Sequence, residues 1–387
     1  MRKILFSYYL YVFLCSFGNS IVGANAVIYV KDFLPLLPWQ HSLLLSMGPI
    51  LVGVLDYPLG NVADFWGMKR TMVSGFLMVG LASIVYSQSR EFSILLTSLF
   101  FIALGTALIS GTGQSWLHFA LGDDEKELFK KALSKGVLIS RSTNLGAALM
   151  APSLIHLAQN MPFLVHGLIF LFGGGVLLAT IQKDFRYNLA ERKNLSFYYF
   201  FKKNTKDIFA SKILKQIMLI TVCEMIFLAV FLFSWQVLIS KEFKAAQEML
   251  GVVYIFLRVV LLLVGILFHK IRKILSTRTV IKIYTGLVLL GAVLVCFSGY
   301  SLIAGLVILE MAIGLISHQN SIFFNQVITH EARTSVFSAI STIASLSMAI
   351  IFFVMNYFQT ELVLKGLVVM SLGAGLGIVW IYRRVWG

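Results

Sequence analysis

Five ionisable side chains lie inside long apolar runs of this sequence: Asp56, Glu224, Glu310, Arg141 and Arg258. A charge at the centre of a bilayer costs about 2.5–3.5 kcal/mol or more, so each side chain is expected to face the protein interior or water. A buried carboxyl group can take up and release a proton, and a buried arginine can bind an anion or neutralise an acid. A static ion pair is the alternative role for each of the five.

These residues predict a central site with both signs of charge. Glu224 and Glu310 are candidates for proton coupling or substrate contact, with structural pairing left open. Asp56 belongs to the same set, but a gate or a structural partner, with Arg141 as first candidate, is the favoured interpretation. The predicted substrate cavity is lined by Arg141, Arg258, Asn19, Gln114, Asn144, Trp235, Gln236, Tyr254 and Gln319. Aromatic residues in spans more often pack than line a cavity.

The composition indicates a membrane protein, because the core of a soluble protein does not need so much apolar surface. The chain has 387 residues, of which 58% are hydrophobic and 13% charged, and its mean hydropathy is +0.87. Apolar runs long enough to cross about 30 Å of hydrocarbon recur along the whole chain. We predict twelve spans, at 4–30, 40–61, 71–89, 92–120, 132–157, 162–181, 213–240, 247–268, 280–298, 301–325, 336–357 and 363–382.

The net charge of +15 comes mainly from Lys and Arg in the predicted loops, so it indicates membrane topology rather than a nucleic-acid-binding surface. With the N-terminus placed inside, 25 Lys and Arg fall on the inner side and 5 in the outer loops. Cytoplasmic loops carry this excess in membrane proteins. We therefore expect a multi-pass protein of a bacterial inner membrane, with both termini cytoplasmic, acting as a monomer among membrane lipids.

The longest polar segment divides the predicted spans into two groups of six. We predict an N-terminal half at 1–181, a cytoplasmic linker at 182–212 and a C-terminal half at 213–387. The linker is basic and aromatic, which fits a solvated segment on an anionic leaflet or a regulatory binding site. A weak repeat links the halves, because GNVADFWGMKR from Gly60 and GILFHKIRK from Gly265 share a glycine, an apolar step and trailing cations.

At these residues the chain resembles the major facilitator superfamily. Gly60, Ala63, Asp64, Gly67, Lys69 and Arg70 fit the family's loop signature between the second and third helices. Ser110 to Gly136 looks like the end of helix 4 and the following loop in efflux-type members, and Thr329 to Ser341 looks like the loop into helix 11. The resemblance implies an all-α fold of twelve transmembrane helices in two six-helix pseudo-repeats.

The resemblance also implies a conformational latch built from Gly60, Asp64, Gly67, Lys69 and Arg70, although Asp64 could instead cap the third helix or be solvated. Two departures count against the standard drug:proton antiporter mechanism. Phe101 stands four residues before Gly105, where such antiporters often carry an arginine. The glycine and proline motif of their helix 5 is also missing.

Together these features predict a secondary active transporter that exports an amphipathic or drug-like small molecule by proton-coupled alternating access. The alternative is a carrier or facilitator of a metabolite, lipid or peptide without proton antiport. The sequence contains no nucleotide-binding loop, metal-ligand cluster or nucleophile elbow. We therefore expect no enzyme activity, no cofactor and no metal.

Overall fold

The computed structural model describes residues 1–110, 112–122, 125–181, 184, 211–243, 246–271, 275–327, 333–357 and 361–386. Within these ranges the side chains at 56–58, 60–65, 126, 130, 246–248, 269–271, 325–327, 333–339, 356–357, 361–365, 367, 370–371 and 383–386 are not described. All regular structure over the described ranges is helical. The chain divides into two compact units, Met1–Lys193 and Asn194–Gly387.

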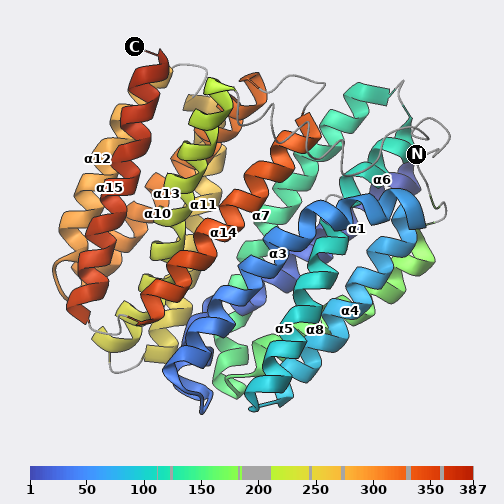
Figure 1. Ribbon diagram of the computed structural model, residues 1–387, viewed down its shortest axis with the longest axis horizontal. Coiled ribbons are helices and arrows are strands. Elements are labelled where there is room, and N and C mark those ends of the chain that lie inside the picture. Colours follow the sequence, from blue (N-terminus) through green and yellow to red (C-terminus); the bar gives the residue numbers. More distant parts are fainter. Residues whose placement is uncertain are drawn as a thin grey trace. The chain divides into compact units, whose positions relative to one another are not determined.

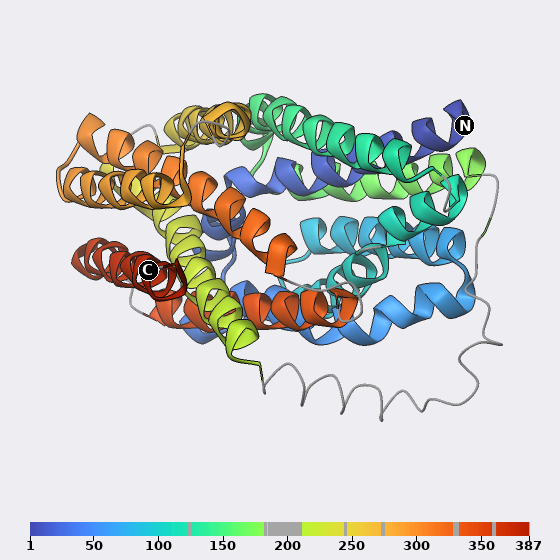
Figure 2. The same ribbon diagram turned by 90° about the horizontal axis from the view of Figure 1, so that it is seen from above.

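The N-terminal unit contains six long segments, two of them interrupted (Figures 1 and 2). They are α1 (Arg2–Ile21), continued by η1 (Val22–Ala24), α2 (Ala26–Ile28) and η2 (Tyr29–Phe33); α3 (Pro38–Trp66); α4 (Met68–Gln88); α5 (Phe92–Ile109), followed by α6 (Thr112–Leu121); α7 (Lys126–Leu157); and α8 (Met161–Thr180).

Over its described residues, the C-terminal unit contains six long helices without such breaks. They are α10 (Lys212–Glu242), α11 (Ala246–Ile271), α12 (Thr277–Val295), α13 (Tyr300–Val327), α14 (Arg333–Tyr357) and α15 (Glu361–Trp386). Ser211 and Ser276 precede α10 and α12 and cap them, because each side-chain oxygen accepts a hydrogen bond from the backbone N–H three residues on. This is the usual way to satisfy a donor in the first turn of a helix.

Each of the twelve predicted spans corresponds to a described helical segment, so the predicted fold class is confirmed. Eight segments are long and apolar enough, by length and composition, to cross a membrane: Arg2–Ala24, Met68–Gln88, Phe92–Leu121, Met161–Thr180, Lys212–Glu242, Met249–Phe268, Thr277–Val295 and Tyr300–Phe324. Shorter apolar stretches, Ile340–Met355 and Leu372–Tyr382, lie in α14 and α15. The predicted linker at 182–212 lies mostly outside the described residues, so its limits stay a prediction.

The fourth predicted span, expected as one helix, is divided after Ile109. Ser110 takes an extended ψ of 128° and ends α5. The Tyr11 hydroxyl on α1 donates a hydrogen bond of 3.1 Å to the carbonyl oxygen of Ile109. It therefore satisfies one of the carbonyls that a helix end leaves free. A side chain at Gly113 would collide with the Tyr11 ring, so the glycine lets α6 approach α1.

The same set of helix pairings is found in both units. In the N-terminal unit the most extensive contacts join α1 to α7 and α8, α3 to α5, and α4 to α5 and α8. In the C-terminal unit they join α10 to α14 and α15, α11 to α13, and α12 to α13 and α15. In chain order these are the same five pairings, which is the arrangement expected of two structural repeats.

Glycine pairs allow the third and fourth segments of each unit to approach closely. A Cβ atom built at Gly75 of α4 or Gly105 of α5 would lie 2.7 Å from the other residue's carbonyl oxygen. For Gly291 of α12 and Gly305 of α13 the two distances are 3.2 and 2.9 Å. Small residues of this kind are how membrane helices gain close backbone contact where no hydrophobic effect drives them together.

We predict that Gly305→Leu lowers the thermal stability of the purified protein in detergent. The new side chain would press on the backbone of α12, at a cost of about 1–3 kcal/mol for an overpacked site. Gly286→Leu on α12 is the matched control, because nothing lies within 4 Å of a Cβ atom there. Equal unfolding midpoints for the two variants would contradict the close packing of α12 and α13.

Candidate functional site

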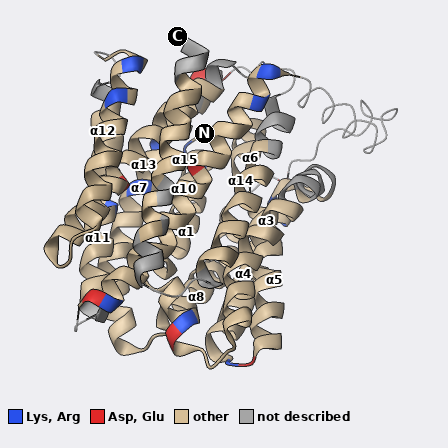
Figure 3. Ribbon diagram, turned by 60° about the vertical axis from the view of Figure 1, so that its left-hand side comes forward, with Lys and Arg blue, Asp and Glu red and all other residues tan. Residues whose placement is uncertain are grey.

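The charges predicted inside spans are divided between the two units. Arg141 lies on α7 in the N-terminal unit, whereas Glu224, Arg258 and Glu310 lie on α10, α11 and α13 in the C-terminal unit. Figure 3 shows that most of the described charged residues lie near helix ends, so charges in the middle of a helix are the exception. Asp56 lies in α3, but its side chain is outside the described residues.

Glu224 is the acid of a buried polar network that joins three helices. The Asn320 side-chain amide on α13 donates a hydrogen bond of 2.5 Å to Glu224 Oε2. The Tyr382 hydroxyl on α15 donates one of 2.8 Å to Asn320 Oδ1. All three side chains are buried. Asn320 is therefore held in one orientation by an acceptor on one side and a donor on the other.

An aromatic pair supports Arg258 in the same unit. The rings of Trp235 on α10 and Tyr254 on α11 are stacked, with centroids 5.9 Å apart and an interplanar angle of 7°. The Arg258 guanidinium carbon lies 4.7 Å from the centroid of the Tyr254 ring. A cation over an aromatic face gains about 0.5–2 kcal/mol, depending on how far it is desolvated. The Tyr254 ring therefore stabilises a positive charge inside the unit, and Trp235 stacks on that ring.

Glu310 on α13 lies near enough to Arg258 for the two charges to interact electrostatically. No ion pair within 4.0 Å joins these two described residues. Arg258 Nε and Glu310 Oε2 are both buried and lack a hydrogen-bond partner. The same holds for Ser234 Oγ and Gln319 Oε1, on α10 and α13.

These four atoms are one guanidinium donor, two oxygen acceptors and one hydroxyl that can donate or accept, and they lie on three helices that pack on one another. Each such buried group costs about 1–3 kcal/mol without a partner. Arg258 and Glu310 therefore each keep hydrogen-bonding capacity that a bound polar molecule could satisfy.

The polar residues of the N-terminal unit form a seam between α1 and α7. Ser16 Oγ donates a hydrogen bond of 2.7 Å to Ser140 Oγ, and Ser20 Oγ donates one of 3.3 Å to the Asn144 carbonyl. With its amide turned to satisfy both ends, Asn144 donates to the carbonyls of Ser140 and Ser16 at 3.2 and 3.0 Å. These bonds place Asn144 in the helix contact, one turn along α7 from the half-buried Arg141.

The remaining predicted cavity residues lie in different surroundings. Trp235, Gln236, Tyr254 and Gln319 are buried in the C-terminal unit, whereas Asn19 on α1 and Gln114 on α6 are exposed. Of these, Tyr254 contacts Arg258 and Trp235 stacks on Tyr254, and the role of each residue stays a prediction.

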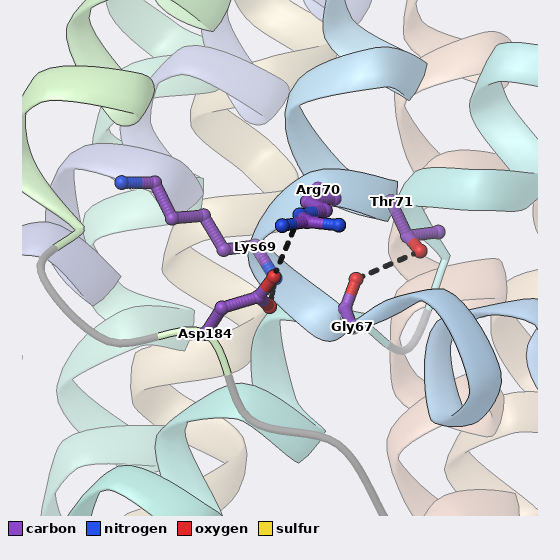
Figure 4. Close-up of polar contacts among 5 residues, drawn as sticks. All are labelled: Gly67, Lys69, Arg70, Thr71 and Asp184. Atoms are coloured by element: carbon purple, nitrogen blue, oxygen red, sulfur yellow. Dashed lines mark hydrogen bonds and ion pairs between the residues drawn. The ribbon is translucent and has the colours of Figure 1, made fainter.

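The loop before α4 is held by an acid that the sequence interpretation did not select. Asp184, just after α8, accepts a hydrogen bond of 2.8 Å from the Lys69 backbone N–H, and its other oxygen lies 3.5 Å from Arg70 Nε (Figure 4). Gly67 has a φ of +106°, a conformation that favours glycine. The predicted latch residues Gly60 and Asp64 lie in α3, outside the residues whose side chains are described.

Comparison with known proteins decides the family. The family model described as Major Facilitator Superfamily matches residues 8–352. The chain belongs to the major facilitator superfamily. No curated protein sequence matches it.

Solved structures of superfamily transporters share the fold at low identity. An auto-inhibited POT family peptide transporter has a TM-score of 0.76 at 13% identity, covering 99% of this chain and 97% of its own. The nucleoside transporter NupG has a TM-score of 0.74 at 10% identity, covering 99% and 98%. A POT family transporter in complex with 5-aminolevulinic acid has a TM-score of 0.73 at 14% identity, covering 99% and 96%. The chain is thus a multi-pass membrane transporter of the superfamily, and these similarities do not single out an efflux-type member.

We predict that Tyr382→Phe destabilises the C-terminal unit by about 1–2 kcal/mol, because it leaves the buried Asn320 oxygen without its donor. The readout is the unfolding midpoint in detergent. Tyr300→Phe is the control, since Tyr300 is 82% exposed at the start of α13. A loss of stability in the control as large as in Tyr382→Phe would contradict the network.

Proposed function

We propose that this secondary transporter carries a small molecule bearing both a positive and a negative group, such as a short peptide or an amino-acid-like compound, by alternating access. The observation that carries the proposal is the pair Arg258 and Glu310 in one unit, each with a buried polar atom, Nε and Oε2, that lacks a partner. A zwitterion would offer a carboxylate to the guanidinium and an ammonium to the acid. Charge-assisted hydrogen bonds of this type are about twice as strong as neutral ones.

The surroundings of the pair fit an amphipathic substrate. The stacked Trp235 and Tyr254 rings offer an apolar wall next to the Arg258 guanidinium. Ser234, next to Trp235 in the chain, adds a buried hydroxyl that lacks a partner. A site that combines apolar walls with a few convergent polar groups is the usual form of a small-molecule site.

The similar solved structures support this substrate class. Peptides and 5-aminolevulinic acid, the compounds named for the POT family structures, each carry an amino and a carboxyl group. Nucleosides, the substrates named for NupG, have no such pair of charges. These similarities favour the carrier alternative of the sequence analysis over export of a drug-like compound.

For the driving force, we propose that Glu224 takes up a proton during the transport cycle. Its carboxylate receives the Asn320 amide, and Tyr382 fixes that amide from the other side. Protonation would turn the acid into a donor on one oxygen and change its bond with Asn320. The helices α10, α13 and α15 would thus respond together to the charge on one residue. Without this step, the protein would be a facilitator.

A first prediction concerns uptake of a labelled dipeptide or of 5-aminolevulinic acid into liposomes that contain the purified protein. Arg258→Gln and Glu310→Gln should each raise the concentration for half-maximal uptake by about 10–100-fold, as expected for losing a charge-assisted bond of 1.5–3 kcal/mol. Arg90→Gln and Glu91→Gln, at exposed positions before α5, are the matched controls. Uptake unchanged in both buried variants would rule out the zwitterion site.

A second prediction separates proton coupling from substrate binding. Glu224→Gln keeps the shape of the side chain and an oxygen for Asn320, but it cannot take up a proton. We expect it to lose accumulation driven by an imposed pH gradient while keeping exchange of labelled for unlabelled substrate. If wild-type uptake does not depend on the imposed pH gradient, the protein is a facilitator. If Glu224→Gln and Glu310→Gln both respond to the gradient like the wild type, neither acid is the coupling site.

A further inference from the structure

A pocket lined by cations lies at the start of α4, in the N-terminal unit. It has a volume of about 640 Å³ and is lined by Trp66, Lys69, Arg70, Val73, Ser74, Leu178 and Asp184. Trp66 is the last residue of α3 and is 57% exposed. Tryptophan is enriched at the level of lipid headgroups. The pocket therefore joins an interfacial aromatic residue to two adjacent cations.

The charges of this pocket do not balance. Asp184 approaches Arg70 only at Nε, at 3.5 Å, and the Arg70 side chain is 70% exposed. No other acid among the described side chains pairs with Arg70, so its terminal guanidinium nitrogens are available within that part of the chain. The Lys69 ammonium points away from Asp184 (Figure 4) and has no ion pair within the part of the chain that the structure describes. Among the described side chains of the pocket, two cations and one acid leave a positive site that suits a phosphate group.

An apolar groove continues from the pocket along the same helix. The groove has a volume of about 710 Å³ and lies between α4 and α5. Its lining shares Ser74 with the cationic pocket. Leu77, Leu81 and Val85 follow at spacings of four residues or fewer, and all three are exposed. Residues at such spacing lie on one face of a helix, so the apolar stripe starts beside the cations.

The part of this stripe nearest the cations lies within one lipid leaflet. From Arg70 to Leu81 the helix advances about 16 Å, at 1.5 Å per residue. Half of a hydrocarbon core of about 30 Å is about 15 Å. Phe101 of α5 lines the groove from the opposite side. An acyl chain that starts at the cations would thus reach the bilayer midplane near Leu81, and the groove continues beyond it to Val85 and Ile94.

We propose that this surface binds one anionic phospholipid, with its phosphate at Lys69 and Arg70 and an acyl chain in the groove between α4 and α5. Charge complementarity selects the headgroup, since a zwitterionic lipid would bring its own cation to a site that is already positive. Basic pockets at the ends of membrane helices are known to hold anionic headgroups. This site lies outside the transport residues proposed above and does not depend on them.

The test compares the protein in nanodiscs or mixed micelles containing phosphatidylglycerol or phosphatidylcholine with identical acyl chains. Lipid retention is measured by native mass spectrometry and stability by the unfolding midpoint. The wild type should retain phosphatidylglycerol in preference to phosphatidylcholine. Arg70→Gln should weaken this preference about fivefold, and Lys69→Gln with Arg70→Gln should weaken it further. Lys282→Gln, an exposed cation in the second turn of α12, is the matched control and should leave the preference intact.

Asp184→Asn separates lipid binding from a purely structural role of the Arg70–Asp184 pair. It keeps an oxygen to accept the Lys69 N–H but removes the negative charge from the pocket. If the cations bind a phosphate, this variant should strengthen the preference for phosphatidylglycerol, opposite in sign to Arg70→Gln. The proposal is overturned if the wild type retains the two lipids equally, if Lys282→Gln weakens the preference as much as Arg70→Gln, or if Asp184→Asn and Arg70→Gln change it in the same direction.

Discussion

The hydrocarbon core of a membrane offers no water to a polar group, so each such group must find its partner within the protein. This constraint explains why the regular structure of the described chain is helical, because a helix satisfies its backbone internally. It also explains what happens where a helix is interrupted. The Tyr11 hydroxyl bonds the carbonyl freed at Ile109, and the Asn25 side-chain amide donates to the Gln159 carbonyl at 3.0 Å beside the irregular end of the first segment.

The same constraint helps to interpret the buried charged residues of the C-terminal unit. Glu224 is partnered by Asn320, which is partnered by Tyr382, so this network is complete within the protein. Arg258 and Glu310 retain buried atoms without partners, at a cost that the fold must offset elsewhere. A network in which every polar group has a partner suits Glu224, because its protonation would change the contacts between helices. Polar atoms without partners suit Arg258 and Glu310, because a substrate can supply those partners. The two clusters thus divide coupling and recognition in the proposed transport cycle.

The sequence was enough to predict the twelve segments, because hydropathy reports directly on which residues avoid water. It was less informative wherever a partner comes from a distant part of the chain. The break at Ser110 depends on Tyr11, which lies 98 residues before the Ile109 carbonyl it bonds. Asp184 lies just after the sixth predicted span, as one acid in a basic segment. No nearby sequence pattern indicates that it contacts Lys69.

Tyr382 stood beside two terminal arginines, where tyrosine usually marks the membrane interface. The repeat left only a faint trace around Gly60 and Gly265 in sequence, whereas the five helix pairings show it in full. Long-range contacts, rather than local patterns, therefore account for most of what sequence reasoning missed.

The central claim is that Arg258 and Glu310 recognise opposite charges on one small molecule. The most direct measurement is the thermal stabilisation of the purified protein by a dipeptide, its N-acetylated form, its C-terminal amide and the compound blocked at both ends, because each small blocking group removes one charge. The account predicts that the unmodified dipeptide stabilises the protein, that each single modification weakens the effect, and that blocking both ends abolishes it. Equal stabilisation by the doubly blocked compound would contradict the account.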